Sequence, residues 1–270
     1  MYKYKLSIIT VNYNNVKGLV DTIESVVNQT NQDFEYIIID GGSTDGSVDV
    51  IKEYTNKIDY WISEKDNGIY HAMNKGVRMV SCEYCIFMNS GDVFYSNDVI
   101  AQVYNKGLSA DIVTGITSIV FNGLKTWWIP PLNVDFSFFY TTTLSHQGSF
   151  IKASILKENL YDERYKIASD WKFFLYALIV LKYSYKSINV IVSRSDTVGV
   201  SSNLSLANFE RKNILENMFP ENILMEYKKK CVNKNGIKRR IGEIILRNRY
   251  LNRLYQTYVY YHIKKNISRY

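Results

Sequence analysis

The sequence has little of several residue types that mark special classes of protein. Of its 270 residues only three are proline and three are cysteine. Three cysteines cannot all pair, and the chain opens on a strand pattern instead of a basic-then-apolar leader, so we expect a reducing, cytoplasmic setting. The longest apolar run, Phe173–Leu181, is far shorter than the roughly 20 residues that cross a bilayer. With 46% hydrophobic residues, the composition is that of an ordered globular chain.

The positive charge is concentrated at the C-terminal end. Residues 226–270 hold 13 Lys or Arg and two acidic residues, whereas the rest of the chain is net acidic. Apolar residues recur at helical spacing from Ile237 to Tyr258, with Arg and Lys between them. This pattern predicts an amphipathic helix that rests on an anionic membrane surface. Docking on the chain's own surface or on another subunit stays an alternative. Because the body is acidic and carries no recognition motif, we expect no nucleic-acid partner.

Short apolar strands alternate with helical patterns over the first hundred residues. The predicted strands are Lys5–Val11, Phe34–Asp40, Tyr60–Ser63 and Tyr84–Met88. The predicted helices between them are Gly18–Asn28, 47–54 and Gly68–Val80. This alternation indicates an α/β fold with a central, mostly parallel sheet flanked by helices. In such sheets ligands bind beyond the carboxyl ends of the strands.

The second half of the chain has a different pattern. Asn122-Gly123 lies between two apolar runs and predicts a tight hairpin. Further along, we expect strands at His146–Ile151 and Tyr185–Ser193, a helix at Asp170–Leu181 and a helix at 204–218. Cys82 and Cys85 have zinc-like spacing, but the chain has no second pair, so we expect both in the core.

Polar residues follow two of the predicted strands where ligands are expected. Asp40 opens the segment Asp-Gly-Gly-Ser, which lacks the Gly-Lys-Ser/Thr of a phosphate-binding Walker loop. Asp92 follows another strand in the segment Asn89-Ser-Gly-Asp92. A carboxylate there can bind Mg²⁺ or Mn²⁺, which prefer oxygen ligands. Taken singly, both segments also fit plain turns.

Four blocks together resemble a known family. Lys5–Asn14, Asp40–Ser47, Ser63–Gly76 and Phe87–Asp92 occur in the order and rough spacing of GT-A glycosyltransferases of family 2, an inverting group that builds bacterial surface polysaccharides. The resemblance implies a GT-A domain at 1–202, followed by a helical, basic extension at 203–270. It also implies a nucleotide-sugar donor, most often UDP-linked, and a saccharide or lipid-linked saccharide acceptor. The enzyme would then be cytoplasmic or peripheral at the inner face of the cell membrane.

The resemblance also assigns roles to residues of the donor site. Tyr13 would lie against the nucleotide base and Asp40 would hydrogen-bond it, while Asn74 and Lys75 would complete the donor site. Asp92 would bind a divalent metal, Mn²⁺ or Mg²⁺. The family usually has acidic residues where this chain has Asn89 and Gly91, which weakens the metal motif, although Asn89 can still coordinate through its amide oxygen. His146 is a further candidate ligand for the metal or the diphosphate.

Asp170 matches the carboxylate of the family that lines the acceptor site. Inverting transfer needs a base that takes the proton of the attacking hydroxyl group, and the resemblance gives this role to Asp170. His71, which replaces an Asp common in the related motif, and the loop Gly199–Ser201 have weaker claims to a role.

Two other functions stay open. A nucleotidyltransferase usually has a Gly-rich, Lys/Arg-containing loop after its first strand, which this chain lacks. A non-catalytic saccharide-binding or scaffold protein could carry the depleted metal motif, but the joint presence of Asp92 and Asp170 argues against it.

Overall fold

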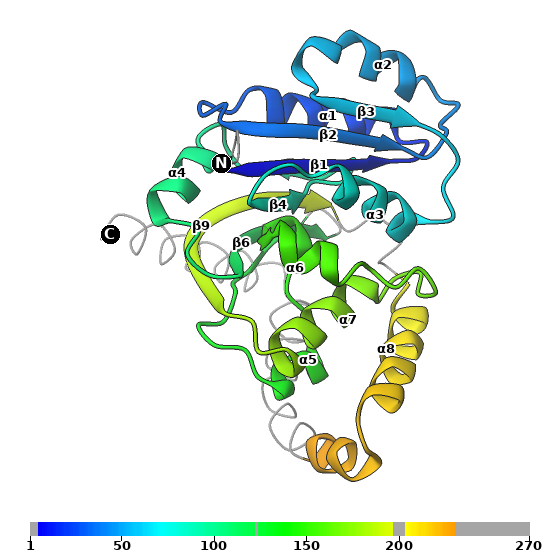
Figure 1. Cartoon of the computed structure of the whole chain (residues 1–270), viewed down its shortest axis with the longest axis vertical. Coiled ribbons are helices and arrows are strands. Elements are labelled where there is room, and N and C mark those ends of the chain that lie inside the picture. The colour runs from blue at the N-terminus through cyan, green and yellow to red at the C-terminus, as the bar shows by residue number, and fades with distance from the viewer. Residues whose placement is uncertain (1–4, 122–123, 197–202, 230–270) are drawn as a thin grey trace.

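The computed structural model describes residues 5–121, 124–196 and 203–229 (Figure 1). The strands are β1 (Leu6–Asn12), β2 (Phe34–Asp40), β3 (Tyr60–Ser63), β4 (Tyr84–Phe87), β5 (Val93–Phe94), β6 (Ile112–Phe121), β7 (Leu124–Trp128), β8 (Ser149–Lys152) and β9 (Tyr185–Asp196). The α-helices are α1 (Val16–Val27), α2 (Ser47–Glu53), α3 (Ile69–Met79), α4 (Val99–Lys106), α5 (Phe136–Thr141), α6 (Ala153–Glu158), α7 (Ser169–Leu175) and α8 (Leu204–Met218). The short helices are η1 (Thr55–Lys57), η2 (His146–Gly148) and the π-helical η3 (Tyr176–Val180).

The strands form one sheet in the order β3-β2-β1-β4-β8-β6-β9-β5, with β7 paired to β6. The N-terminal half is parallel, as predicted: β1 pairs with both β2 and β4, and β2 pairs with β3. The other half is mixed, since β8, β5 and β7 all pair antiparallel while β6 and β9 are parallel. The expected parallel arrangement is thus confirmed in the N-terminal half, and antiparallel strands are added in the other half. The short hairpin between β6 and β7 leaves no room for the crossover that a parallel pair needs.

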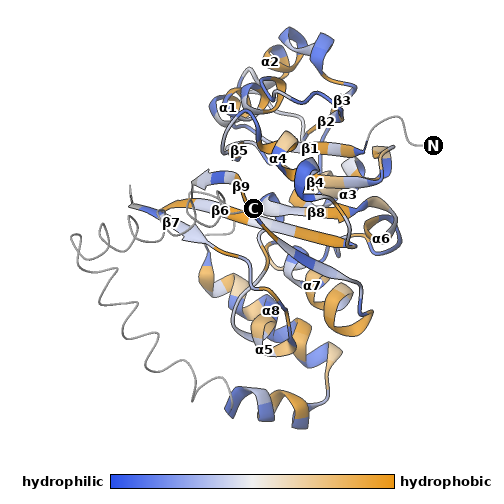
Figure 2. Cartoon of the chain, turned by 90° about the vertical axis from the view of Figure 1, so that its left-hand side faces the viewer, coloured by the Kyte–Doolittle hydropathy of each residue, from blue (hydrophilic) through white to orange (hydrophobic). Residues whose placement is uncertain are grey.

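Helices cover both faces of this sheet, and each face has its own core. On one face α1, α2 and α4 pack around Leu19, Ile51 and Val103, whereas α3, α5, α6 and α7 pack on the other around residues such as Met73 and Trp171. Along β1, successive side chains alternate between the two cores, as the period of a strand requires. Figure 2 shows α1 and α2 near β2 and β3, with α5, α7 and α8 gathered below β6 and β8.

Most of the predicted elements are confirmed, and two need correction. His146–Ile151 begins as the turn η2 and becomes a strand only at Ser149. The helix predicted at Asp170–Leu181 starts at Ser169 as α7 and continues as the π-helical η3 from Tyr176. Cys82 and Cys85 are buried, as expected. The hairpin tip Asn122-Gly123 and the loop Gly199–Ser201 lie outside the described residues.

Helix α8 forms part of the same core as the sheet. Ile214 of this helix is fully buried in the cluster that also contains Trp171, although α8 lies in the segment predicted as an extension. Residues 221–229 are helical as well. Most of the basic segment 226–270, from residue 230 onward, lies outside the described residues, so the helix predicted there stays a prediction. Within the described ranges, none of the helices combines the length and the hydropathy that crossing a membrane requires.

Candidate active site

The carboxyl ends of the parallel strands bring the predicted donor residues to one edge of the sheet. Asn12 at the end of β1 is in register with Asp40 at the end of β2, and Asp40 is in register with Ser63 at the end of β3. The next strand outward from β1, β4, leads directly into the segment that carries Asn89 and Asp92. The edge at which ligands bind in such sheets therefore collects these polar side chains.

Asp40 lies inside this edge and is fully buried. Its Oδ1 accepts from the Asn12 amide at 2.8 Å and from the Ser43 hydroxyl at 2.6 Å. Its Oδ2 accepts from the Ser63 hydroxyl at 2.6 Å and from the backbone N–H groups of Gly42 and Ser43. Burial acts to raise the pKa of Asp40, but these hydrogen bonds outweigh it and hold the pKa below its ordinary value. Five donors fill the roughly four acceptor positions of a carboxylate, so the structure does not support the predicted contact between Asp40 and the base.

Tyr13 is placed as a ligand-stacking residue would be. The residue is 67% exposed. Its ring lies over Gly41, as the distance of 3.2 Å between Tyr13 Cδ2 and a Cβ added to that glycine shows. The same added Cβ would lie 3.3 Å from Oδ2 of Asp66. The missing side chain of Gly41 thus leaves the ring and the carboxylate adjacent. An exposed aromatic ring of this kind is a surface on which a flat base can stack.

Lys75 lies in an ion cluster beside this surface. Its Nζ is 2.7 Å from carboxylate oxygens of both Glu64 and Asp66. Burial acts to lower the pKa of Lys75, but the two carboxylates outweigh it and raise the pKa above its ordinary value. His71 joins the cluster through Nδ1, which is 2.8 Å from Oδ1 of Asp66. His71 and Lys75 therefore hold Asp66 in place, a part that the sequence alone did not give to either residue.

Asn74 has a structural part. It is almost fully buried, and its Nδ2 donates to the carbonyl of Tyr161 at 2.9 Å and to Glu163 at 2.8 Å. Its Oδ1 accepts from the backbone N–H of Tyr161 at 2.9 Å. Both ends of the amide are thus engaged in fastening the segment around residue 161 to α3. The structure gives no support to the predicted contact of Asn74 with the donor, because the residue is buried and spends both N–H groups and one lone pair of its oxygen on these partners.

The segment that follows β4 is shaped by α1. Thr22 accepts from the backbone N–H of Gly91 at 2.9 Å and donates to the carbonyl of Asp92 at 2.7 Å. Gly91 has φ +100°, a conformation that favours glycine. This tight turn suits the glycine that stands where the resemblance predicted a carboxylate. The turn leaves Asp92 partly buried, close enough to His146 for their charges to interact.

Asp170 lies at the start of α7 and joins three elements. Its Oδ2 is 3.1 Å from Nδ1 of His146, and its Oδ1 accepts from the Tyr70 hydroxyl at 2.9 Å and from the backbone N–H of Trp171 at 2.8 Å. Burial acts to raise the pKa of Asp170, but His146 and these donors outweigh it and hold the pKa below its ordinary value. The side chain is 16% exposed. Asp170 is therefore an ionised carboxylate, with one acceptor position left on Oδ2.

His146 connects Asp170 to the donor edge. While Nδ1 faces Asp170, Nε2 lies 3.3 Å from Nδ2 of Asn89. Burial acts to lower the pKa of His146, but Asp170 outweighs it and raises the pKa. The two halves of the predicted site, which are far apart in the sequence, thus meet through a single imidazole ring.

A divalent metal fits this place only as a site shared with the substrate. Among the described residues no group of three or more His, Cys, Asp or Glu side chains is arranged to hold a metal. However, Oδ1 of Asn89 is buried and has no hydrogen-bond partner in the described part of the chain, and Asp92 is close by in the same turn. Mg²⁺ and Mn²⁺ are commonly held by one or two protein oxygens together with substrate phosphates. The donor set therefore fits a metal that binds together with a diphosphate.

Helix α8 contributes two residues that sequence reasoning missed. Glu210 is buried, and its carboxylate accepts from the backbone N–H groups of Lys166, Ile167 and Ala168 at 2.8–2.9 Å. It thereby fixes the segment that leads into α7 and Asp170. The Arg211 guanidinium lies over the ring of Trp171, 5.5 Å from its centre, so α8 forms one wall beside Asp170.

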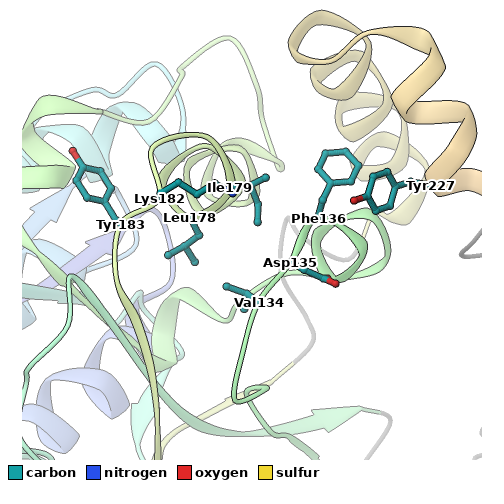
Figure 3. A pocket seen from close by; sticks show the side chains of 8 residues that line it. All are labelled: Val134, Asp135, Phe136, Leu178, Ile179, Lys182, Tyr183 and Tyr227. Atoms are coloured by element: carbon teal, nitrogen blue, oxygen red, sulfur yellow. The ribbon is translucent and has the colours of Figure 1, made fainter.

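A separate pocket lies away from these residues. Its volume is about 430 Å³, and Figure 3 shows side chains from α5, from η3 with the residues that follow it, and from the helix near Tyr227 around it. Its lining residues are Val134, Asp135, Phe136, Leu178, Ile179, Lys182, Tyr183 and Tyr227. None of the residues predicted to act on the donor or the acceptor lines it.

Comparison with known proteins gives consistent results at the level of sequence and fold. The profile of a family described as Glycosyl transferase family 2 matches residues 7–164. An uncharacterised glycosyltransferase of Mycobacterium tuberculosis is 33% identical over 205 residues, which cover 73% of this chain and 77% of that protein. A PGL/p-HBAD biosynthesis glycosyltransferase of Mycobacterium bovis is 26% identical over 208 residues, which cover 73% of this chain and 78% of that protein.

Two solved structures share the fold. Residues 1–349 of S. aureus TarS in complex with UDP superpose with a TM-score of 0.62 at 18% identity, covering 85% of this chain and 71% of that one. The chain covers only 43% of the longer TarS structure. The mannosyltransferase PcManGT from Pyrobaculum calidifontis, in complex with GDP-Man and Mn²⁺, gives a TM-score of 0.53 at 14% identity, covering 71% of this chain and 57% of that one. These likenesses confirm the expected GT-A fold.

Proposed function

Because this chain belongs to glycosyl transferase family 2, we propose that it transfers a sugar, with inversion, from a nucleoside-diphosphate donor to a hydroxyl group of a saccharide or lipid-linked saccharide in polysaccharide biosynthesis. The observation that carries this proposal is the placement of Asp170. It is a partly buried, ionised carboxylate, and His146 links it to the edge of the sheet where Tyr13 and Asp92 lie. The fold neighbours that contain UDP or GDP-Man support a nucleotide-sugar donor.

In the proposed reaction the acceptor hydroxyl oxygen attacks the anomeric carbon of the donor sugar. The bond from that carbon to the diphosphate breaks, and the nucleoside diphosphate leaves. Oδ2 of Asp170 takes the hydroxyl proton, while Tyr70 and the backbone N–H of Trp171 keep Oδ1 occupied and hold the carboxyl group in orientation.

The donor would lie along the edge of the sheet. Its base would stack on Tyr13, and its diphosphate would reach the turn that carries Asn89 and Asp92. These two side chains would hold a divalent cation together with the diphosphate, and such a cation supplies Lewis-acid stabilisation of the leaving group. His146 orients Asp170 through Nδ1 and contacts Asn89 through Nε2. It therefore couples the proposed base to the proposed diphosphate site. Lys75 acts through Asp66 and not on the donor directly.

A binding screen of nucleotide sugars with Mn²⁺, Mg²⁺ or EDTA tests the donor class, and turnover of any ligand found tests the reaction. If no nucleoside diphosphate binds under any of these conditions, the proposal is wrong.

The variant Asp170→Asn tests the proposed catalytic base: we expect donor affinity to be retained and the transfer rate to fall by about 10²–10⁴-fold. Asp49→Asn is a matched control, because this carboxylate is 80% exposed. Near-normal transfer by Asp170→Asn would remove Asp170 from the mechanism.

We further propose that the basic segment 226–270 brings the enzyme to an anionic membrane surface, where a lipid-linked acceptor would be available. The proposal rests on the net positive charge of this segment and on the helical spacing of its apolar residues. Truncation after Met225 should abolish co-sedimentation with vesicles that contain anionic lipid, whereas the full chain should sediment with them. Equal sedimentation of both proteins would refute the membrane role.

A further inference from the structure

The proposed donor site needs an acceptor atom that can read the edge of a nucleobase, and Asp40 cannot supply it. Both oxygens of Asp40 are occupied by five donors from Asn12, Gly42, Ser43 and Ser63. A ligand could reach this carboxylate only by displacing hydrogen bonds that shape the ends of β1, β2 and β3. The nucleobase must therefore be read by another group close to Tyr13.

Asp66 has the free acceptor atom that Asp40 lacks. Its Oδ1 faces Nζ of Lys75 at 2.7 Å and Nδ1 of His71 at 2.8 Å. Its Oδ2 is buried and has no hydrogen-bond partner among the described residues. The side chain is only 9% exposed. A buried carboxylate oxygen without a donor carries a desolvation cost, which a ligand that brings an N–H or O–H group would relieve.

The surroundings of Oδ2 form a slot for a flat ligand. A Cβ on Gly41 would approach both this oxygen and the ring of Tyr13, at 3.3 Å and 3.2 Å. The absence of a side chain at position 41 therefore keeps the space between them open. Two thirds of the Tyr13 side chain is exposed, so the ring can rotate toward solvent, admit a base and stack on it.

We propose that Asp66 is the residue that reads the nucleobase of the donor, and that it selects bases with a protonated ring nitrogen at their pairing edge. The inference rests on the proposed function and deepens it. An ionised carboxylate only accepts hydrogen bonds. Uracil and guanine offer a ring N–H there, whereas cytosine and adenine present an unprotonated ring nitrogen whose lone pair opposes the carboxylate. The donor is therefore a uridine or guanosine diphosphate sugar.

Calorimetric titration of the full chain with UDP, GDP, CDP and ADP in the presence of Mn²⁺ tests this inference. The wild-type protein should bind UDP or GDP more tightly than CDP and ADP. In Asp66→Asn, the affinity for the preferred nucleotide should fall by about 10- to 150-fold, while the affinities for CDP and ADP stay the same or rise. The asparagine amide can donate as well as accept, so the preference between bases should largely disappear.

Glu64→Gln is the matched control, because it also removes a carboxylate that pairs with Lys75 but leaves Asp66 intact. It should leave the order of the four nucleotides unchanged. An equal loss of affinity for all four nucleotides in Asp66→Asn, or no loss at all, would overturn the role of Asp66 and leave the proposed function standing. If the wild-type protein binds none of the four, the proposed function itself fails, and this inference fails with it.

A second variant keeps the test decisive if Asp66→Asn does not fold. Gly41→Ala leaves the ion pairs of Asp66 intact and places a methyl group between Tyr13 and Oδ2. It should weaken binding of the preferred nucleotide by about 10-fold or more. Unchanged affinity in a folded Gly41→Ala protein would show that the base does not enter this slot and would overturn the inference.

Discussion

The buried carboxylate of Glu210 offers a sharp test of how the acceptor side of the site is held. It accepts hydrogen bonds from three successive backbone N–H groups, those of Lys166, Ile167 and Ala168. Asp170 follows two residues later, and the Tyr70 hydroxyl lies within donating distance of both the Ile167 carbonyl and Oδ1 of Asp170, which share its one proton. We expect Glu210→Gln to destabilise the protein and to slow sugar transfer without weakening nucleotide binding.

The magnitude follows from the hydrogen bonds. If the glutamine oxygen takes the place of Oε2, it keeps the bonds from Ile167 and Ala168, and the amide nitrogen then faces the N–H of Lys166. One charged hydrogen bond worth about 2 kcal/mol is lost, and two others weaken by about 1 kcal/mol each. A neutral amide is cheaper to bury than a carboxylate, which offsets part of this loss. We therefore expect a decrease of about 2–4 kcal/mol in the free energy of unfolding.

Urea unfolding at pH 7 measures the stability effect, and initial rates at saturating donor measure the catalytic effect. A shift of about 1 Å in a reacting group can cost on the order of 100-fold in rate, so kcat should fall by about 10- to 100-fold with the nucleotide Kd unchanged. Glu216→Gln on the same helix makes the same chemical change at a side chain that is 54% exposed. If Glu210→Gln matches this control in stability and in rate, Glu210 does not hold the segment before Asp170.

Two further predictions concern the fold. In Gly76→Ala the new Cβ would lie 2.5 Å from Cγ2 of Ile9, so overpacking of α3 on β1 should lower the free energy of unfolding by about 1–3 kcal/mol; thermal unfolding equal to wild type would show that the contact relaxes freely. The hydrogen bond from Arg164, together with Lys172, holds the pKa of Asp162 well below its ordinary value, so its contribution to stability is present above about pH 4 and is lost as the pH falls toward the depressed pKa. Urea unfolding should show Asp162→Asn about 1 kcal/mol less stable at pH 7, and a difference that persists unchanged at pH 3 would contradict the ion pairing.

The N-terminal part of the sheet, which carries the proposed donor site, could be predicted closely from the sequence. The strands Phe34–Asp40 and Tyr60–Ser63 were predicted at their observed boundaries, because a continuous apolar run between polar turns is a local pattern. What the sequence could not show is which carboxylate is occupied. Asp40 is filled by hydroxyl and amide groups from three strand ends, and Asp66 keeps one oxygen free only because His71 and Lys75 take the other. These facts depend on tertiary contacts and leave no periodic signal.

The elements around Asp170, on the proposed acceptor side, were harder to predict. The helices α4, α5 and α6 were not predicted, and they are short, at eight, six and six residues. One signal was available in α8. Ala207, Glu210 and Ile214 follow each other at helical spacing, and all three are buried. A glutamate on the apolar face of a helix indicates a partner inside the fold, and here that partner is the backbone before Asp170.

The contacts of Asp170 indicate that nucleotide binding and sugar transfer can be separated by mutation. Its carboxylate is oriented from three directions: Tyr70 of α3, His146 of η2 and, through the backbone at 166–168, Glu210 of α8. Tyr13, Gly41 and Asp66 lie at the far ends of β1, β2 and β3, and α8 packs against α7, away from these strands (Figure 1). A change at Glu210 should therefore affect Asp170, the proposed catalytic base, without disturbing the slot that is proposed to bind the nucleobase. His146 is the exception, since it contacts both Asp170 and Asn89, and a variant at this position should affect nucleotide affinity and transfer together.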